Sequence, residues 1–263
     1  GDVITGNVTI YARWRLCRRY LWDFVEVKAI ANSEDRVVRG IWSGFVAGRE
    51  VLCAACNGYL WELLLENGLM SKKACGELRT DSDVFMFGFS GKLFLQNGSE
   101  YKVWDGTSLL PVSGYRPLVL RGCSPAGGGS LLEGVNMLTG KKRALYSPDG
   151  VSAVFQLPET QLVSIDYVKN AATGADMEGC TFDSAAARVS FSSAPPTGTD
   201  SIEIGWCSAH NRADEVLAMR FAELYNGAQD SRIFIYGDGT NRLFYSGIDT
   251  GGQPRADYFP DLC

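Results

Sequence analysis

Histidine is almost missing from this sequence. The 263 residues include only His210, which lies between Ala209 and Asn211. A Ser-His-Asp or Cys-His catalytic arrangement would have to use this one imidazole. No Gly-x-Ser-x-Gly elbow precedes a helical stretch to supply a nucleophile. We therefore interpret His210 as a loop or capping residue, predict no catalytic residue, and expect that the chain is not an enzyme.

Positive charge and long apolar runs are also scarce. Lys and Arg number 25 against 30 Asp and Glu, which gives a net charge of -5. A protein that binds nucleic acid over its whole surface needs the opposite balance. No stretch reaches the roughly 18–20 apolar residues of a membrane span, and the first residues lack the pattern of a signal peptide. We predict no membrane insertion and interpret the local basic runs as solvated faces; these are Arg13, Arg15, Arg18, Arg19, Lys141, Lys142 and Arg143.

The 8 cysteines are scattered along the chain instead of clustered, and several lie in apolar runs. We expect mostly reduced, buried thiols, as in proteins made in a reducing cytoplasm. Cys53-x-x-Cys56 has the spacing of half a zinc site, but a second Cys pair or a His pair is missing. Residues three apart on a strand also face opposite sides. Buried core is therefore favoured over a metal or redox site, and we predict no metal and no cofactor.

Three further features have both a functional and a structural interpretation. Paired carboxylates would suit a glycosidase, but acidic residues beside tight turns more often form the turn; the pairs are Asp81 with Asp83 and Glu100 with Asp105. Gly127 to Gly129 lacks the Gly-Lys-Ser/Thr ending of a phosphate loop and is interpreted as a flexible linker. Tryptophans near strands would stack sugars or, as is commoner, pack between sheets; they are Trp42, Trp61, Trp104 and Trp206.

Tight turns divide the chain into short strands. Glycine often follows Asn, Asp or Ser, and such pairs supply the positive φ that hairpins need. Examples are Asn57-Gly58, Ser90-Gly91, Asn97-Gly98 and Asp105-Gly106. The runs between these turns predict antiparallel meanders, the unit of a propeller blade. They comprise Val51 to Ala55, Tyr59 to Leu65, Val84 to Phe89, Lys92 to Gln96 and Glu100 to Trp104.

The second half of the chain predicts a different domain. After the glycine-rich loop, short strand-like runs indicate a small β-sandwich; they comprise Ala153 to Leu157, Leu162 to Val168, Cys180 to Phe182, Arg188 to Phe191 and Ile202 to Trp206. One connecting helix is predicted over Ala213 to Tyr225, with Asn226-Gly227 as its end. The expected fold is all-β with a minor helix. Propeller-like blades occupy 1–120, an inserted sandwich 121–210, and the helix and returning strands 211–263.

Several pieces of the chain, in order, resemble one protein family. They are Gly40 to Gly44, Ala54 to Leu63, the stretch GKLFLQNGSEYKVWD (91–105), Tyr115-Arg116-Pro117, Glu133 to Thr139, RVSFSSAPPTG (188–198), NRLFYSG (241–247) and ADYFP (256–260). Together they are similar to phage virion proteins of the tail-nozzle, tail-hub or packaged-DNA-stabilisation type. In such proteins a stretch Y-x-P followed by E-x-x-N-x-L-T leads from a β-propeller into an inserted β domain.

This resemblance implies a structural role in the virion. Six copies would form a ring below the portal, extend the DNA channel and retain the genome until ejection. The implied partners are further copies, portal or head-tail adaptor proteins, tail fibres or tip proteins, and double-stranded DNA in passage. The implied location is the phage tail, assembled in the bacterial cytoplasm. The strands fill two or three of the four to eight blades of a complete propeller, which predicts a fragment or a short relative of a longer protein.

Two alternatives stay open. A tail propeller that binds or cleaves glycans at the host surface would need an exposed aromatic cluster with paired carboxylates in a cleft. A prophage remnant without function is the other alternative.

Overall fold

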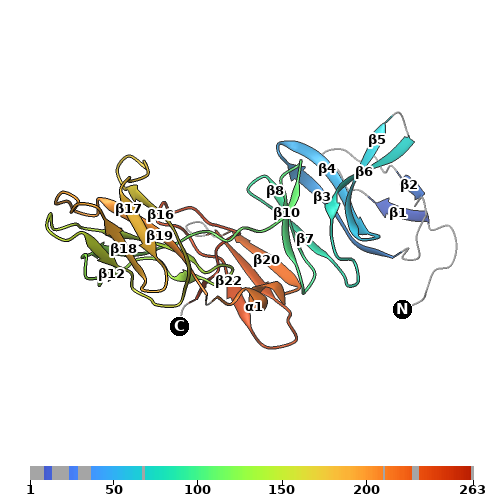
Figure 1. Ribbon diagram of the computed structural model, residues 1–263. Helices are drawn as coiled ribbons and strands as arrows, with labels where there is room; N and C mark the ends of the chain where they lie inside the picture. Colours follow the sequence, from blue (N-terminus) through green and yellow to red (C-terminus); the bar gives the residue numbers. More distant parts are fainter. Residues whose placement is uncertain are drawn as a thin grey trace. The chain divides into compact units, whose positions relative to one another are not determined.

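The structure is a computed structural model of the chain, and it describes residues 9–13, 24–28, 37–66, 69–209, 211–226 and 231–261. Strands make up the fold, and α1 (Ala213–Leu217) is the only helix in these ranges (Figure 1). The expected all-β class is therefore confirmed. The chain divides into two compact units: unit 1 comprises 1–97 with 102–110, and unit 2 comprises 98–101 with 111–263.

Unit 1 contains two four-stranded sheets whose strands follow one another in chain order. The first consists of β3 (Val38–Val46), β4 (Arg49–Cys56), β5 (Tyr59–Glu66) and β6 (Leu69–Glu77). The second consists of β7 (Phe85–Phe89), β8 (Lys92–Gln96), β9 (Tyr101–Trp104) and β10 (Leu109–Pro111), of which Tyr101 and Pro111 are counted with unit 2. A separate hairpin pairs β1 (Thr9–Arg13) with β2 (Phe24–Lys28). Both four-stranded sheets are meanders, as the turn pattern predicts.

The hairpin turns explain this topology. Asn57 and Gly58 have φ values of 51° and 77°, and Ser90 and Gly91 have 48° and 71°. Two successive positive φ values define the type I′ turn, whose twist matches that of the flanking strands. Ala47-Gly48 makes the same turn between β3 and β4, with φ values of 51° and 78°. The sequence did not predict this turn, because alanine is uncommon at positive φ.

The two meanders pack face to face through one hydrophobic core. Gly40 on β3 lies so close to the carbonyl of Val84 that a side chain there would clash, and a Cβ on Gly88 would lie 2.9 Å from the Trp42 ring. Glycine at these positions therefore lets the sheets approach. The core takes Val46, Val51, Cys53, Ala55 and Leu60 from the first meander, Met86, Leu93, Leu95 and Trp104 from the second, and Leu78 and Val84 from the connection.

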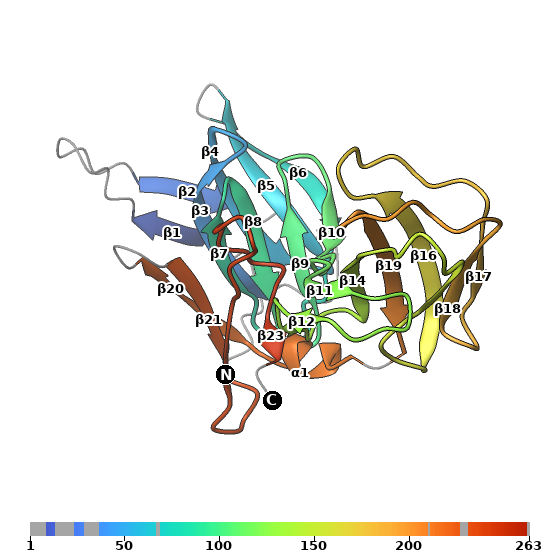
Figure 2. The same ribbon diagram turned by 90° about the vertical axis from the view of Figure 1, so that its left-hand side faces the viewer.

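Unit 2 contains a β-sandwich. Its larger sheet has five strands in the order β12 (Ser130–Leu131), β11 (Leu118–Cys123), β14 (Lys141–Tyr146), β19 (Ile202–Ser208) and β16 (Leu162–Asn170). Its smaller sheet has the order β15 (Val154–Gln156), β18 (Arg188–Phe191) and β17 (Cys180–Asp183). Figure 2 shows β16 and β19 of the first sheet beside β17 and β18 of the second. The strands predicted over 153–206 are present.

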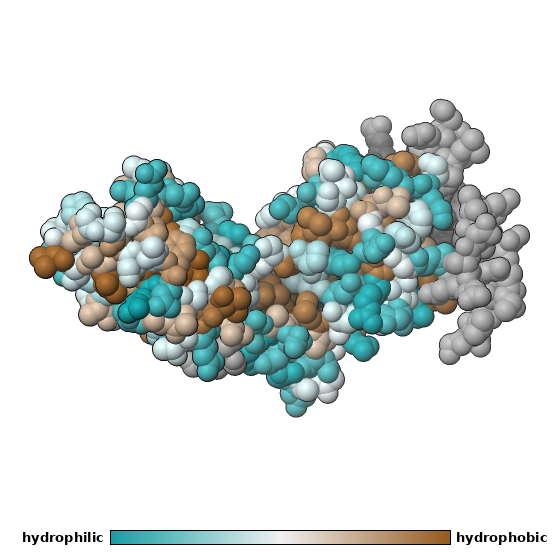
Figure 3. All heavy atoms as spheres, viewed as in Figure 1, coloured by the Kyte–Doolittle hydropathy of each residue, from teal (hydrophilic) through white to brown (hydrophobic). Residues whose placement is uncertain are grey.

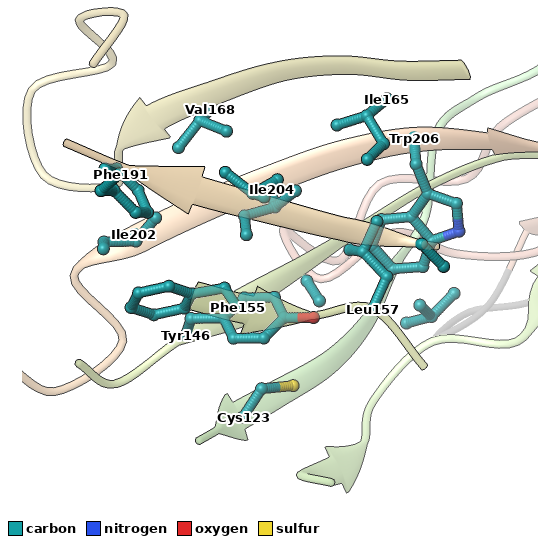
Figure 4. Close-up of a cluster of buried hydrophobic side chains, with 14 residues drawn as sticks. Cys123, Tyr146, Phe155, Leu157, Ile165, Val168, Phe191, Ile202, Ile204 and Trp206 are labelled. Atoms are coloured by element: carbon teal, nitrogen blue, oxygen red, sulfur yellow. The ribbon is translucent and has the colours of Figure 1, made fainter. Parts of the chain in front are cut away.

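One core fills the space between these two sheets. Tyr146, Ile204 and Trp206 from the larger sheet lie against Phe155 and other residues of the smaller one (Figure 4). The rings of Tyr146 and Phe155 meet edge to face with centroids 5.8 Å apart, a favoured aromatic geometry. β11 extends across position 120, and it belongs to the same sheet as β14. The sandwich therefore includes residues from both sides of the expected boundary.

The glycine-rich stretch, which the sequence predicted to be a loop or a flexible linker, is a loop. It closes the short connection between β11 and β12, which pair antiparallel within one sheet. Gly127, Gly128 and Gly129 have φ values of 98°, 84° and 109°, a left-handed conformation that favours glycine. These glycines therefore form a loop inside the sandwich.

The prediction of a long helix was wrong beyond Leu217. The chain leaves α1 and enters β20 (Phe221–Asn226), which pairs with β21 (Ser231–Tyr236); β21 in turn pairs with β22 (Leu243–Tyr245). Leu217, Phe221 and Leu224 have helical spacing, but Phe221 and Tyr225 are exposed while Ala222 is buried. This alternation is the period of a strand, and six paired residues on β21 stabilise it.

Candidate functional site

Segments far apart in the sequence meet at one junction within unit 2. β13 (Val135–Asn136) pairs antiparallel with β23 (Pro260–Asp261). The Tyr115 amide donates to the Asp257 carbonyl at 2.8 Å, and the Met137 amide donates to the Phe259 carbonyl at 2.9 Å. Three of the eight pieces that carry the family resemblance, 115–117, 133–139 and 256–260, are therefore joined by backbone hydrogen bonds. We call this cluster the junction.

Asn136 lies at the centre of the junction. Its side chain is buried, and its Nδ2 donates to the carbonyls of Tyr115 and Asp257 at 2.9 and 2.8 Å. Its Oδ1 accepts from the amides of Leu138 and Phe259 at 3.2 and 3.1 Å. All four groups belong to the backbone, so one amide side chain satisfies donors and acceptors on three segments.

A buried carboxylate extends the junction. Glu133 accepts from the Tyr115 hydroxyl at 3.2 Å, from the Thr250 amide at 2.7 Å and from the Leu118 amide. The Tyr258 hydroxyl donates to the Gly134 carbonyl at 2.9 Å. Burial raises the pKa of Tyr258, so this hydroxyl stays a neutral donor at physiological pH. Because the Glu133 carboxylate accepts hydrogen bonds from backbone amides in this way, its role is structural.

The apolar side of the junction is formed by two aromatic residues. Tyr101 and Phe259 are buried, and their rings meet edge to face at 6.1 Å. The Tyr101 hydroxyl donates to the Ala256 carbonyl at 2.9 Å. This contact ties the segment ahead of the sandwich to residues near 256.

A second polar cluster covers the outer face of the five-stranded sheet. Glu203 on β19 accepts from Arg143 at 3.0 Å and from the Tyr167 hydroxyl at 2.7 Å. The Arg116 guanidinium lies 5.0 Å from the centre of the Tyr167 ring, a cation–π contact. Any side chain on Gly205 would clash with Arg116 and Tyr167. Burial, and then the hydrogen bond to Glu203, raises the pKa of Tyr167 to about 12, which keeps it a donor.

A charge pair in the described part of unit 1 includes a buried carboxylate. The Glu62 side chain is 3% exposed and pairs with both terminal nitrogens of Arg49, one of them at 3.1 Å. The Arg49 guanidinium also lies 5.6 Å from the centre of the Trp104 ring. The bidentate contact and the ring compensate the cost of burying the carboxylate.

The cysteine pair behaves as the strand geometry predicts. Cys53 is fully buried in the core of unit 1, whereas Cys56 on the opposite face of β4 is partly exposed. Burial raises the pKa of Cys53 to about 12, so its thiol stays protonated. Among the residues that the structure describes, no three His, Cys, Asp or Glu side chains gather as metal ligands would. His210 lies outside the described residues.

The four candidate carboxylates have structural contacts or a surface position. Asp105 Oδ1 accepts from the amides of Thr107 and Ser108 at 2.8 Å, and these bonds lower its pKa. Asp105 thus forms a turn, as its position predicts. Asp81 and Asp83 are solvent-exposed and lie 3.5 and 3.9 Å from arginines, weak surface pairs. Glu100 lies between β8 and β9, just ahead of Tyr101.

Two of the four candidate tryptophans are core residues. Trp104 and Trp206 are fully buried, and the Trp206 indole donates to Glu159. Trp42 packs against the core of unit 1. Trp61 is partly exposed and has the Lys72 ammonium 4.0 Å from its ring centre. The expectation of packing between sheets is therefore met by Trp104 and Trp206.

The basic run 141–143 is partly neutralised. Lys142 pairs with Glu159 at 2.8 Å and Arg143 with Glu203 at 3.0 Å, while Lys141 is exposed. Of the N-terminal cluster, Arg15, Arg18 and Arg19 lie outside the described residues, and Arg13 is described only as the end of β1.

The sequence analysis missed an aromatic surface on unit 2. One face of the sheet β20-β21-β22 carries large side chains that the strand register places together. We call it the aromatic face; it comprises Phe221, Tyr225, Phe234, Tyr236, Leu243 and Tyr245, and the charged residues Glu223 and Arg232 lie among them. Tyr225 and Leu243 are 57% and 54% exposed, whereas Ile233 and Ile235 on the opposite face are fully buried. The alternate spacing of these aromatic residues indicates strands, but it was overlooked because part of the segment was predicted to be helical.

Comparison of the chain with protein-family models, with curated proteins and with solved structures gives no match. Within the described ranges, no helix has the length and apolar character needed to cross a membrane.

Proposed function

We propose that this chain is a structural virion protein of a bacteriophage tail, a nozzle or hub protein of the packaged-DNA-stabilisation type. In this proposal, the two stacked meanders of unit 1 are propeller blades. Several copies, six by analogy with the resembling proteins, form a ring below the portal. The ring extends the DNA channel and retains the genome until ejection.

The junction is the observation that carries this proposal. The resemblance rests on short pieces that lie far apart in the sequence; Asn136 and Asp257, for example, are 121 residues apart. A chance resemblance gives no reason for such pieces to lie together. The pieces at 115–117, 133–139 and 256–260 are linked by side-chain and backbone hydrogen bonds. Their residues thus act as one structural element, which supports the interpretation that the resembling pieces belong together.

The chemistry of the described polar groups fits a mechanical role. Glu133, Asn136 and Glu203 each bond to other protein groups, and such networks fix one geometry. A net charge of -5 is compatible with a channel through which DNA slides, since an acidic wall repels phosphate. In this role the chain needs symmetric contacts with its copies and docking surfaces for portal, adaptor and fibre proteins.

Electron cryomicroscopy of purified particles and of the recombinant chain tests the proposal. We expect the protein in the tail of intact virions, arranged as a ring around the DNA axis. A tail density into which neither unit fits, or a chain absent from purified virions, would contradict it.

A further inference from the structure

Residues 254–261 are held by backbone hydrogen bonds to three other segments of unit 2. We call these residues the strap, which ends in β23. The Gly247 amide donates to the Tyr258 carbonyl at 2.7 Å, and the Arg255 amide donates to the Gly247 carbonyl at 3.1 Å. The other backbone bonds are those of the junction. We call the site that receives the strap the slot; it is formed by Tyr101, Tyr115, 134–137 and 246–248.

Two consecutive aromatic side chains anchor the strap in the slot. Figure 3 shows hydrophobic side chains reaching the surface among hydrophilic ones, but Tyr258 and Phe259 are only 3% and 0% exposed. The Tyr258 ring lies against Gly247, where any side chain would clash with it. The Phe259 ring meets the Tyr101 ring edge to face at 6.1 Å. Main-chain bonds combined with buried anchor side chains are the means by which proteins bind an extended peptide as an added strand.

The slot has hydrogen bonds of its own that do not involve the strap. The Glu133 carboxylate accepts from the Tyr115 hydroxyl at 3.2 Å, and Asn136 Nδ2 donates to the Tyr115 carbonyl at 2.9 Å. The Arg212 amide donates to the Met137 carbonyl at 3.1 Å. When the strap leaves, these bonds remain in place. The slot is therefore a preformed site, and preformed sites bind with a smaller loss of conformational freedom.

An exposed turn joins the strap to the preceding part of the chain. Residues 250–253 are exposed, and Asp249 Oδ1 accepts from the Gly251 amide at 3.0 Å. The Thr250 amide also donates to Glu133 at 2.7 Å. Exposed turns of small and polar residues are preferred sites of proteolytic cleavage. The covalent link to the strap can therefore be cut after the chain has folded.

We propose that the slot is a peptide-binding site, which the chain fills with its own strap. The ligand that it takes is an extended segment with two adjacent aromatic residues and a following proline, as in Tyr258-Phe259-Pro260. Because the strap is tethered beside the slot, its high effective concentration keeps the site filled. The strap is thus a detachable lock that joins β13 to the segment after β22. This inference goes beyond the proposed function and does not depend on it.

The test cuts the full chain in its folded state. A recognition sequence for a site-specific protease is inserted between Gly251 and Gly252, and the protein is cleaved after folding. Circular dichroism reports whether the fold survives, and size-exclusion chromatography with mass spectrometry reports whether the cleaved strap co-elutes. A fluorescein-labelled peptide with the sequence of the strap, PRADYFPD (254–261), is then added in excess. Fluorescence anisotropy measures its uptake.

We expect the cleaved protein to keep its fold and its strap, and the labelled peptide to replace the strap. The uncleaved protein should take up no peptide at the same concentration, because the tethered strap outcompetes it. A peptide with Phe259→Ala lacks a buried aromatic anchor and should bind more than about 10-fold more weakly. Cleaved Asn136→Ala should also bind the peptide more weakly, whereas cleaved Asn241→Ala, altered at an exposed position, should bind it as the wild type does.

Three results overturn the inference. If cleavage unfolds the protein, the strap is an integral part of the fold and the slot is not a separate site. If the cleaved protein stays folded but takes up no labelled peptide, even in urea too dilute to change the circular dichroism, the slot does not bind a free segment. If the Phe259→Ala peptide binds as tightly as the unchanged one, uptake occurs elsewhere than in the slot.

Discussion

Replacing Asn136 by alanine should separate the segments that meet at the junction. The change removes the side-chain partner of the buried Phe259 amide and of the partly buried Leu138 amide, which donate to Asn136 Oδ1 at 3.1 and 3.2 Å. The Asp257 carbonyl keeps its bond from the Tyr115 amide. An orphaned buried donor costs about 1–3 kcal/mol, and a partly buried donor costs less because water reaches it, so we expect a loss of about 1–4 kcal/mol. That is a large share of the ~5–15 kcal/mol that holds a typical protein folded.

Amide hydrogen exchange and urea unfolding measure this loss. We expect the exchange protection of Leu138 and Phe259 to fall in Asn136→Ala, together with the urea midpoint, at an unchanged m-value. Asn241→Ala is the matched control, because Asn241 is exposed in the loop between β21 and β22; its effect should stay within about 0.5 kcal/mol. A loss below about 1 kcal/mol in Asn136→Ala, with both amides still protected, would refute the assignment of Asn136 as the centre of the junction.

Three other perturbations have defined outcomes. Gly205→Ala should lower the thermal midpoint by the equivalent of about 1–3 kcal/mol, because its Cβ overlaps the side chains above it. Glu62→Gln should lower the free energy of unfolding, measured with urea, by about 1–3 kcal/mol. Breaking a fully buried ion pair costs more than this, but the Arg49 side chain is 44% exposed and therefore partly solvated. Burial raises the pKa of Cys53 to about 12 and that of Cys123 to about 11, from 9.0. A thiol whose pKa is higher in the folded than in the unfolded protein contributes stability that is lost as the pH rises from the unfolded pKa to the folded one. The urea midpoint should therefore fall between about pH 9 and 12. At about pH 8.5, iodoacetamide should label both thiols only after denaturation.

The strands were predictable where turn chemistry and periodicity agreed. Asn57-Gly58 and Ser90-Gly91 specify positive φ at two positions, and the flanking runs therefore pair as hairpins. The prediction failed at 213–225, where Leu217, Phe221 and Leu224 satisfy a helical period as well as part of a strand. The pairing of β20 with β21 decided the outcome, and this non-local contact is invisible to a local pattern.

The candidate site was less accessible to sequence reasoning. Glu133 and Asn136 were noticed only through the family resemblance, because a lone carboxylate and a lone amide carry no local signal. Their role depends on segments about 120 residues away, which contribute the amides of Thr250 and Phe259. The aromatic face was hidden for a different reason, since its alternation was read as part of a helix and a return strand.

The ends of the sandwich are anchored at the same place, and this bears on how the domain would work. The chain enters the sandwich just after Tyr115, whose amide bonds to Asp257. It leaves through Arg212, whose amide donates to the Met137 carbonyl at 3.1 Å and whose guanidinium pairs with Asp261 at 2.8 Å. An insertion held at both ends by one hydrogen-bonded cluster cannot rotate about a single flexible tether. Force applied to the sandwich is therefore transmitted directly to β13 and β23.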